Sequence, residues 1–161
     1  MLIQVTASYY AYHFLEWGFH KLGHNKRWGG IIYRVHMAHH HKYHIGNLLQ
    51  EGEYEGASGE IVFIPCMLVV WICVWWFMND IFSLFVVTTS ILLFISNVIH
   101  QEIHRKESWL EQNEVTREWF LERRKFHLLH HHNPQYNMSL GGISYIADEI
   151  METLRHPLDF A

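Results

Sequence analysis

The fold is decided by residues 61–99, which read IVFIPCMLVVWICVWWFMNDIFSLFVVTTSILLFISNVI and contain one charged side chain, Asp80. This stretch divides into two apolar halves, Ile61–Met78 and Ile81–Ile99, separated by the turn-forming pair Asn79-Asp80. At about 1.5 Å per helical residue, each half approaches the roughly 30 Å thickness of the hydrocarbon layer. Such a run is too long for the core helix of a small domain. It predicts a transmembrane hairpin in an all-α, integral-membrane helical bundle.

Basic residues flank this stretch on both sides. All 12 Lys and Arg fall within residues 21–42 or 105–155, and the tip of the hairpin has none. Because basic loops stay on the cytoplasmic side, we expect both flanks to face the cytoplasm, at a bacterial inner membrane or the endoplasmic reticulum. Residues 1–19 are also largely apolar and helical in pattern. They either cross the membrane or lie partly embedded in it.

The composition excludes several other classes of protein. A length of 161 residues predicts a single domain, 1–161, and a charged fraction of 17% argues against disorder and a coiled coil. The net charge of -4 leaves no basic surplus for nucleic acid. Cys66 and Cys73 are about 10 Å apart along a helix, too far for a disulfide.

Histidine is the residue that points to chemistry, because 15 of the residues are histidines and they are grouped. Two groups precede the hairpin, HKLGH and HMAHH, and two follow it, HQEIH and HLLHH. Within each group the spacing is three or four residues, which places the rings on one face of a helix. All four groups lie on the same predicted side of the membrane. The ten histidines concerned are His20, His24, His36, His39, His40, His100, His104, His127, His130 and His131.

Ten inward-facing imidazoles predict a metal site. Buried ring nitrogens are costly unless their lone pairs are satisfied, and ten exceed what one ion can use, so we expect two ions. Imidazole suits iron, zinc and copper, so the ligand type does not choose the metal. Neither a repeated Glu-x-x-His nor a His-Glu-x-x-His motif occurs, which argues against soluble carboxylate-bridged di-iron proteins and zincin proteases.

The order of these motifs resembles the fatty acid hydroxylase/sterol desaturase superfamily of membrane non-haem di-iron enzymes. The similarity covers roughly residues 12–155 and is greatest in RRKFHLLHHHNPQYN, residues 123–137, followed by Ala147-Asp148 and Thr153-Leu154. The resemblance implies a helical bundle with a cytoplasmic, histidine-rich di-metal cap, two iron ions held by the ten histidines (or zinc in their place), and O2 as co-substrate. It also implies a membrane lipid as substrate and a separate electron donor of the cytochrome b5 or ferredoxin type.

Several functions remain open at this point. The first is O2-dependent C–H hydroxylation of a fatty acyl or related lipid chain. Desaturation of a lipid and carotenoid hydroxylation would use the same site. The third box, HQEIH, and the segment His41-Lys42-Tyr43-His44 after the second box depart from the pattern of small carotenoid hydroxylases. A zinc-dependent membrane hydrolase is a further alternative, and the oligomeric state is undetermined.

Residues near the boxes are candidates for orienting the imidazoles. Glu16, His44, Asn97 and Asp148 are the principal ones, and Glu102 and Asn137 serve equally well as ordinary caps or turn residues. His41 and His132 are one residue past their groups, so we expect them to face away from the ligands. Residues 45–60 form an acidic, Gly-rich loop that either covers the access path of the substrate or simply connects. Glu111–His132 is predicted to be an amphipathic helix that ends at Asn133-Pro134.

Overall fold

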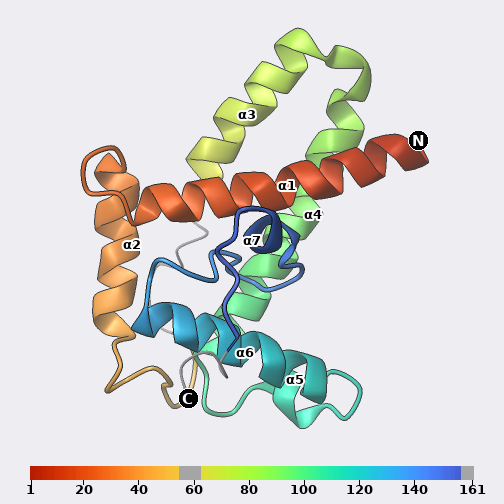
Figure 1. Ribbon diagram of the computed structural model, residues 1–161. Helices are drawn as coiled ribbons and strands as arrows, with labels where there is room; N and C mark the ends of the chain where they lie inside the picture. The colour runs from red at the N-terminus through yellow and green to blue at the C-terminus, as the bar shows by residue number, and fades with distance from the viewer. Residues whose placement is uncertain (55–62, 157–161) are drawn as a thin grey trace.

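The computed structural model describes residues 1–54 and 63–156, and within them the chain is helical. The only β-type pairing among these residues is an isolated parallel bridge between Gln50 and Arg105. This confirms the all-α prediction for the described chain. The helices, in chain order (Figure 1), are α1 (Leu2–Gly23), α2 (Gly30–Lys42), α3 (Ile64–Phe77), α4 (Asn79–Ile103), α5 (Trp109–Gln112), α6 (Arg117–His132) and α7 (Ile146–Ile150).

The apolar stretch forms a helical hairpin, α3 and α4, which projects from the rest of the molecule (Figure 1). Trp71 of α3 donates a hydrogen bond from Nε1 to Thr89 Oγ1 of α4, 3.0 Å away. The chain reverses at Met78, whereas Asn79 and Asp80 begin α4. The predicted turn is therefore displaced by one residue, because Asp80 is favourable in the first turn of a helix.

The two arms of the hairpin differ in length. The 25 residues of α4 make the one described helix long and apolar enough to cross a membrane. Only 17% of its apolar window is buried inside the protein, unlike the core helix of a soluble domain. The 14 residues of α3 span about 21 Å, less than the hydrocarbon layer. The first predicted half, Ile61–Met78, is helical from Ile64 to Phe77, and its residues 61 and 62 lie outside the described part of the chain.

Helix α1 crosses the hairpin instead of running beside it (Figure 1). It packs mainly on α4 and, at its C-terminal end, on α2. Among the described helices, α4 has the length and apolar composition of a membrane span, and α1 does not. Residues 1–19 belong to this crossing helix, and whether they cross the membrane or lie partly embedded in it stays a prediction.

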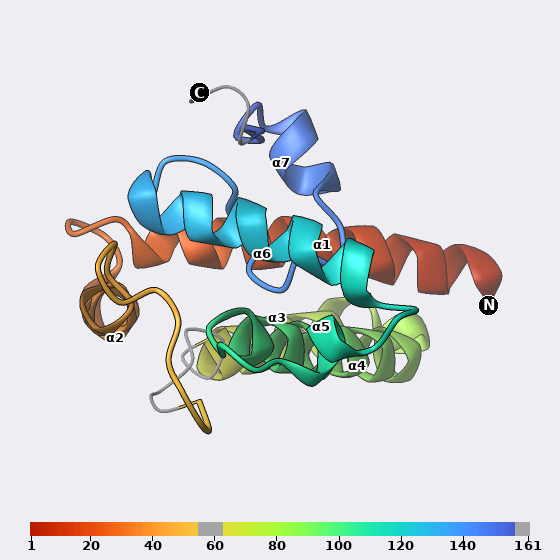
Figure 2. The ribbon, with the colours of Figure 1, turned by 90° about the horizontal axis from the view of Figure 1, so that it is seen from below.

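Helices α2 and α6 complete the half of the molecule below α1 in Figure 1, and Figure 2 shows α2 at the end of α1. The predicted helix 111–132 is interrupted. Asn113 ends α5, its side chain accepts a hydrogen bond from the amide of Val115, and α6 begins at Arg117. The predicted end at Asn133-Pro134 is confirmed. The small core beneath the helices contains Ile99, Ile103, Leu110 and Phe120.

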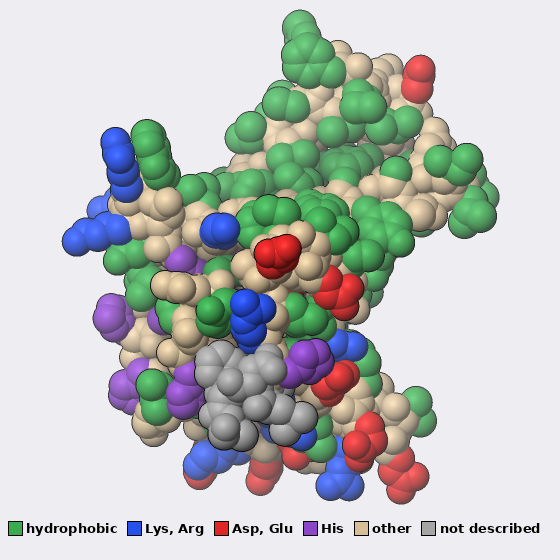
Figure 3. Space-filling view, in the orientation of Figure 1, with side chains coloured by type: hydrophobic (Ala, Val, Ile, Leu, Met, Phe, Trp, Pro, Cys, Tyr) green, Lys and Arg blue, Asp and Glu red, His purple; other side chains and the backbone are tan. Residues whose placement is uncertain are grey.

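The surface is divided in the same way as the fold. Figure 3 shows hydrophobic side chains over the hairpin, while most charged side chains and the visible histidines lie in the opposite half. The exposed hydrophobic side chains of the hairpin are Ile64, Leu68, Val69, Ile72, Trp75, Trp76, Phe77, Met78, Val87, Ile91, Phe94 and Ile95. The molecule therefore has one apolar half and one polar half.

Candidate metal centre

The ten predicted histidines converge in two adjacent clusters beneath α1. Each cluster draws rings from α2 and α6, while α1 contributes only to the first and the end of α4 only to the second. The first cluster contains His20, His24, His36, His40 and His130. The second contains His39, His100, His104 and His127, with His131 beside it. The rings of His40 and His131 stack with centroids 4.3 Å apart, so the two clusters are in contact.

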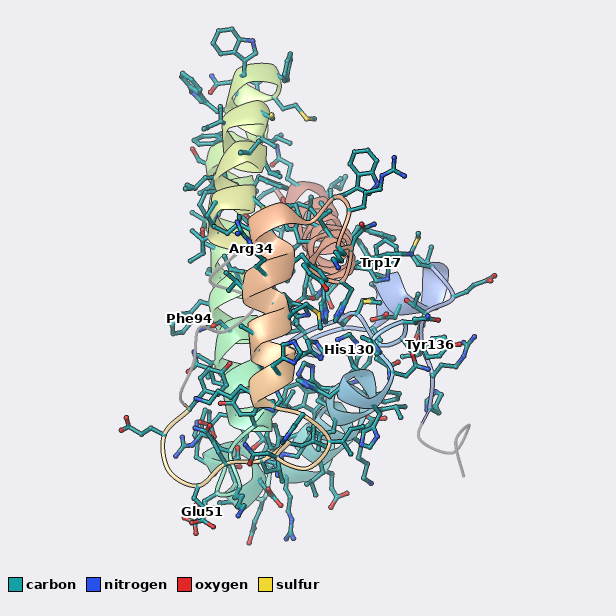
Figure 4. All side chains as sticks on the ribbon, turned by 90° about the vertical axis from the view of Figure 1, so that its left-hand side faces the viewer. Trp17, Arg34, Glu51, Phe94, His130 and Tyr136 are labelled. Atoms are coloured by element: carbon teal, nitrogen blue, oxygen red, sulfur yellow. The ribbon has the colours of Figure 1, made fainter. Side chains whose placement is uncertain are left out.

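In the first cluster the Nε2 atoms face one another. Nε2 of His24 lies 3.2 Å from that of His20, 3.0 Å from that of His130 and 2.9 Å from that of His36. Nε2 of His40 lies 3.1 Å from that of His36 and 3.3 Å from that of His130. Figure 4 labels His130 of α6, whose side chain extends toward α2. Five ring nitrogens thus surround one small volume.

The second cluster is centred on His127. Its Nε2 lies 3.1 Å from the Nε2 atoms of His100, His104 and His131 alike. Nε2 of His39 lies 3.2 Å from that of His131, on the other side of the group. Every one of these rings is buried.

Hydrogen bonds alone cannot satisfy this arrangement. One Nε2 carries either a single proton or a single lone pair, so His127 cannot pair with three other Nε2 atoms. A shared cation can. At metal–nitrogen distances of about 2.1 Å, neighbouring ligands lie about 3.0 Å apart in an octahedron and about 3.4 Å apart in a tetrahedron. The observed separations of 2.9 to 3.3 Å match those edges, so the residues present fit two metal ions.

The opposite ring nitrogens are held by main-chain carbonyl groups. Nδ1 of His20 lies 2.5 Å from the carbonyl oxygen of Met138, Nδ1 of His130 lies 2.7 Å from that of Tyr136, and Nδ1 of His104 lies 2.9 Å from that of Leu48. A carbonyl oxygen only accepts, so each Nδ1 must donate its proton. That tautomer leaves the lone pair on Nε2, the nitrogen that faces the cluster. These carbonyl partners could not be predicted from the sequence, because every residue has a main-chain carbonyl group.

Burial lowers the pKa of nine of the ten clustered imidazoles and so favours their neutral form. It lowers the pKa of His24 to about 4, and burial together with the neighbouring His24 lowers the pKa of His130 to about 3. Burial, followed by the charges of nearby imidazoles, also lowers the pKa of His20, His36 and His127 well below the usual value. Neutral imidazole is the form that binds a metal.

Asp148 supports the first cluster from a distance. Its buried carboxylate accepts hydrogen bonds from the amides of Met138 and Ser139 and from the hydroxyls of Ser139 and Thr153, at 2.6 to 2.9 Å. The carbonyl group of the same residue, Met138, accepts the hydrogen bond from His20. Asp148 therefore positions a backbone segment and does not touch a ring.

Glu16 lies one turn before His20, but its carboxylate is directed to other partners. One carboxylate oxygen accepts a hydrogen bond from Ser96 of α4 at 2.5 Å, and the other lies 3.6 Å from Nδ1 of His13. Ser96 in turn accepts a hydrogen bond from the amide of Gly141. Glu16 thus joins α1 to α4 immediately beside the two helical turns that carry His20 and His100.

The remaining candidates differ in burial and in their partners. Asn97 is half-buried one turn before His100, whereas His44 is exposed beyond the end of α2. Glu102 accepts hydrogen bonds from Arg105 and from the amide of Trp109. Asn137, with a positive φ of 54°, holds the backbone of Phe126 and Arg155. His41 and His132 are exposed, as expected. Part of the loop 45–60 lies outside the described residues.

The helical fold and the paired, nitrogen-only clusters are those of a histidine-rich protein suited to bind metal, with one long apolar helix among the described residues. A comparison with protein families identifies the family to which the chain belongs. The fatty acid hydroxylase family matches residues 5–153, and the chain belongs to that family. Searches of curated proteins and of solved structures return no significant match.

Proposed function

We propose that the protein is a membrane di-iron oxygenase that hydroxylates a C–H bond of a fatty acyl or related lipid chain. The observation that carries this proposal is the pair of clusters with Nε2 atoms at coordination distances, in a chain of the fatty acid hydroxylase family. Iron held by neutral ligands would supply the activation of O2 and the oxidation of an unreactive carbon.

The protein's own residues set the conditions for that chemistry. Helices α1, α2, α4 and α6 bring the rings together, and the carbonyl groups of Leu48, Tyr136 and Met138 fix the tautomer of three of them. Burial lowers the pKa of rings such as His20 and His127 well below the usual value, which favours the neutral form that binds a metal. No carboxylate joins either cluster within residues 1–54 and 63–156, so the donor set is neutral.

The location of the site fits a lipid substrate. The exposed apolar hairpin would lie in the bilayer, with the clusters just outside it; the basic flanks favour the cytoplasmic side for them. A lipid chain would then reach the site from the membrane, while a separate electron donor of the cytochrome b5 or ferredoxin type would approach from the cytoplasm.

Metal analysis and product analysis test this proposal together. We expect two iron ions per chain after anaerobic reconstitution, oxygen consumption with a reductant, and lipids with one added oxygen in a host that has a compatible reductase. Lipids that have lost two hydrogens would identify a desaturase with the same site. Bound zinc with no oxygen consumption would contradict the proposal and favour a zinc-dependent hydrolase, because imidazole binds zinc equally well.

A further inference from the structure

The connection between α1 and α2 carries a group of cationic side chains. Lys21, near the end of α1, and Lys26 and Arg27, in the connection itself, line one hollow of about 620 Å³. The opposite wall of this hollow comes from the segment after α6, with Gln135 and Met138. Two segments that are far apart in the chain therefore enclose it.

No carboxylate neutralises these cations. Residues 20–44 contain five Lys and Arg but no Asp or Glu, although the whole chain has a net charge of -4. None of the three cations of the hollow makes an ion pair with a carboxylate in the described part of the chain. The ammonium of Lys21 lies 4.5 Å from the centroid of the Trp17 ring, and the guanidinium of Arg27 lies 4.9 Å from that of Trp28. The connection therefore presents positive charge that is available to an anionic ligand.

The connection is held in a fixed shape by Asn25. Its side-chain oxygen accepts hydrogen bonds from the amides of Arg27 and Trp28, each 3.0 Å long, and its carbonyl oxygen accepts one from the amide of Gly29 at 2.7 Å. A Cβ added at Gly29 would collide with the carbonyl oxygens of Leu22 and Asn25, so this turn is tight. Its geometry leaves the side chains of Arg27 and Trp28 exposed.

Exposed apolar side chains lie beside these cations. Trp28 is 69% exposed, and Ile31, in the first turn of α2, is 65% exposed. Figures 1 and 4 show the connection at the end of α2 that lies in the direction in which the hairpin projects. Lys and Arg side chains gather at this corner of the molecule in Figure 3. An exposed Trp flanked by Lys and Arg is typical of a segment at the membrane–water interface.

We propose that the hollow binds the phosphate head group of an anionic phospholipid from the bilayer that surrounds the hairpin. Lys26 and Arg27 would supply the charge, because a guanidinium pairs with phosphate through two parallel hydrogen bonds and each cation near an anionic surface adds attraction. Trp28 and Ile31 would pack among the upper carbons of the acyl chains. This lipid is a ligand of the membrane surface and not the substrate. The inference rests on the membrane location in the proposed function, but not on the metal or the reaction.

The bound head group would also set the depth of the first cluster relative to the bilayer. His24, a half-buried ring of that cluster, lines the same hollow. Met138, whose carbonyl group holds His20, lines it from the other side. A phosphate held between these walls would thus fix the first cluster at the level of the lipid head groups.

Lipid binding to the full-length, metal-loaded protein in a nonionic detergent tests the assignment. Dioleoylphosphatidylglycerol is the anionic probe, and dioleoylphosphatidylcholine is the probe with the same chains but no net charge. Native mass spectrometry counts the bound lipids. Wild-type protein should bind phosphatidylglycerol more tightly. A variant with Lys26→Gln and Arg27→Gln together should bind phosphatidylglycerol about thirtyfold more weakly, as expected for two lost charges, and phosphatidylcholine unchanged.

The matched control combines Arg117→Gln with Lys125→Gln, because it removes two exposed cations of α6 that lie outside the lining of the hollow. It should keep the preference for phosphatidylglycerol. Equal binding of the two lipids by wild type, or an unchanged preference in the variant of Lys26 and Arg27, would overturn the proposal. Metal content is measured on the same samples. Two bound ions with no lipid preference would refute this inference alone, whereas protein that binds no metal would refute the proposed function.

Two further probes separate the lipid from other anions. Inorganic phosphate that binds as tightly as phosphatidylglycerol would show a site for a free anion and would overturn the proposal. Polyglutamate stands for the surface of an acidic protein. If it binds wild type but not the variant, and neither lipid is preferred, the surface belongs to a protein partner and the proposal is again overturned.

Discussion

At the scale of single residues, the chemistry depends on which ring nitrogen faces the cluster. His130 donates from Nδ1 to the Tyr136 carbonyl and presents Nε2 to His24 and His40. His132, two residues further along the same helix, is exposed. Two histidines two residues apart therefore have opposite surroundings, which provides a matched pair for substitution.

His130→Ala should lower bound metal from two ions to about one per chain and abolish product formation, since the first cluster loses one of its five rings. His132→Ala should retain both ions and full activity. The measurement is metal analysis of purified protein beside the lipid product assay. If His130→Ala keeps two ions and wild-type activity, His130 is not a ligand.

Asp148 shows a second kind of residue effect, in which a buried carboxylate positions a loop. Asp148→Asn replaces one of the two accepting oxygens with an amide group, which then opposes either the Met138 amide at one position or the Ser139 amide at the other. We expect a loss of about 3 kcal/mol in the free energy of unfolding and weaker metal binding in the first cluster. Thermal melting and metal titration measure both. Glu149→Gln, at the exposed neighbouring position, should change neither quantity; equal melting of the two variants would contradict this account.

At the scale of helices and loops, α4 and the segment that carries Met138 approach each other closely. Gly141 lies so close to α4 that an added Cβ would be 2.4 Å from Ser96 Oγ and 2.5 Å from Ser96 Cα. The helix backbone cannot yield, so Gly141→Ala must push the segment away. The Met138 carbonyl would move with it.

Gly141→Ala should therefore destabilise the protein by about 2 kcal/mol, in the range of overpacked cores. Gly18→Ala is the control, because nothing lies within 4 Å of the added Cβ and alanine favours the helix. It should stabilise α1 by about 0.5 to 1 kcal/mol. Chemical denaturation in detergent compares the two variants, and a Gly141→Ala protein as stable as wild type would show that this approach is not tight.

Sequence predicted the elements well where a long pattern was available. The apolar run gave α3 and α4, and the histidine spacing placed ten rings on inward faces, because periodicity of three or four residues survives tertiary packing. It failed at the break before Arg117, where a local Asn113 turn interrupts an otherwise helical pattern. It also missed the supporting carbonyl groups of loops, whose positions depend on long-range contacts such as those of Asp148.

At the scale of the whole molecule, the buried imidazoles make stability depend on pH in the metal-free protein. In the unfolded chain a histidine takes up a proton near pH 6.5. In the folded chain His24 and His130 do so only near their pKa values of about 4 and about 3. The unfolded state thus binds more protons between these limits, and stability falls as the pH falls from about 6.5 toward 4.

We expect the melting midpoint of the metal-free protein to drop between pH 7.5 and pH 5. Each such histidine lowers the free energy of unfolding by about 1.4 kcal/mol per pH unit below about pH 6.5. Between pH 7.5 and 8.5 these groups are neutral in both states, so the midpoint should not move. Thermal melts at the three pH values check this. A midpoint that rises on acidification would show that the rings are not buried and neutral.

The division into an apolar and a polar half makes a last prediction, on orientation in the membrane. The hairpin tip at Asp80 and the exposed Lys125 of α6 lie in opposite halves of the molecule. Cys66 and Cys73 are both free, so serine can replace them without loss of a disulfide. Asp80→Cys and Lys125→Cys can then each be introduced into that background as a single labelling site.

A membrane-impermeant maleimide added to intact cells should label Asp80→Cys and should label Lys125→Cys only after the membrane is opened. The expectation follows from the exposed apolar surface of α4, which lipid would cover, and from the basic flanks, which the positive-inside rule predicts on the cytoplasmic side. Labelling of both positions from the same side would contradict a spanning hairpin. It would instead indicate that α3 and α4 are covered by another protein surface, and a lipid would then have to reach the histidine clusters by a different path.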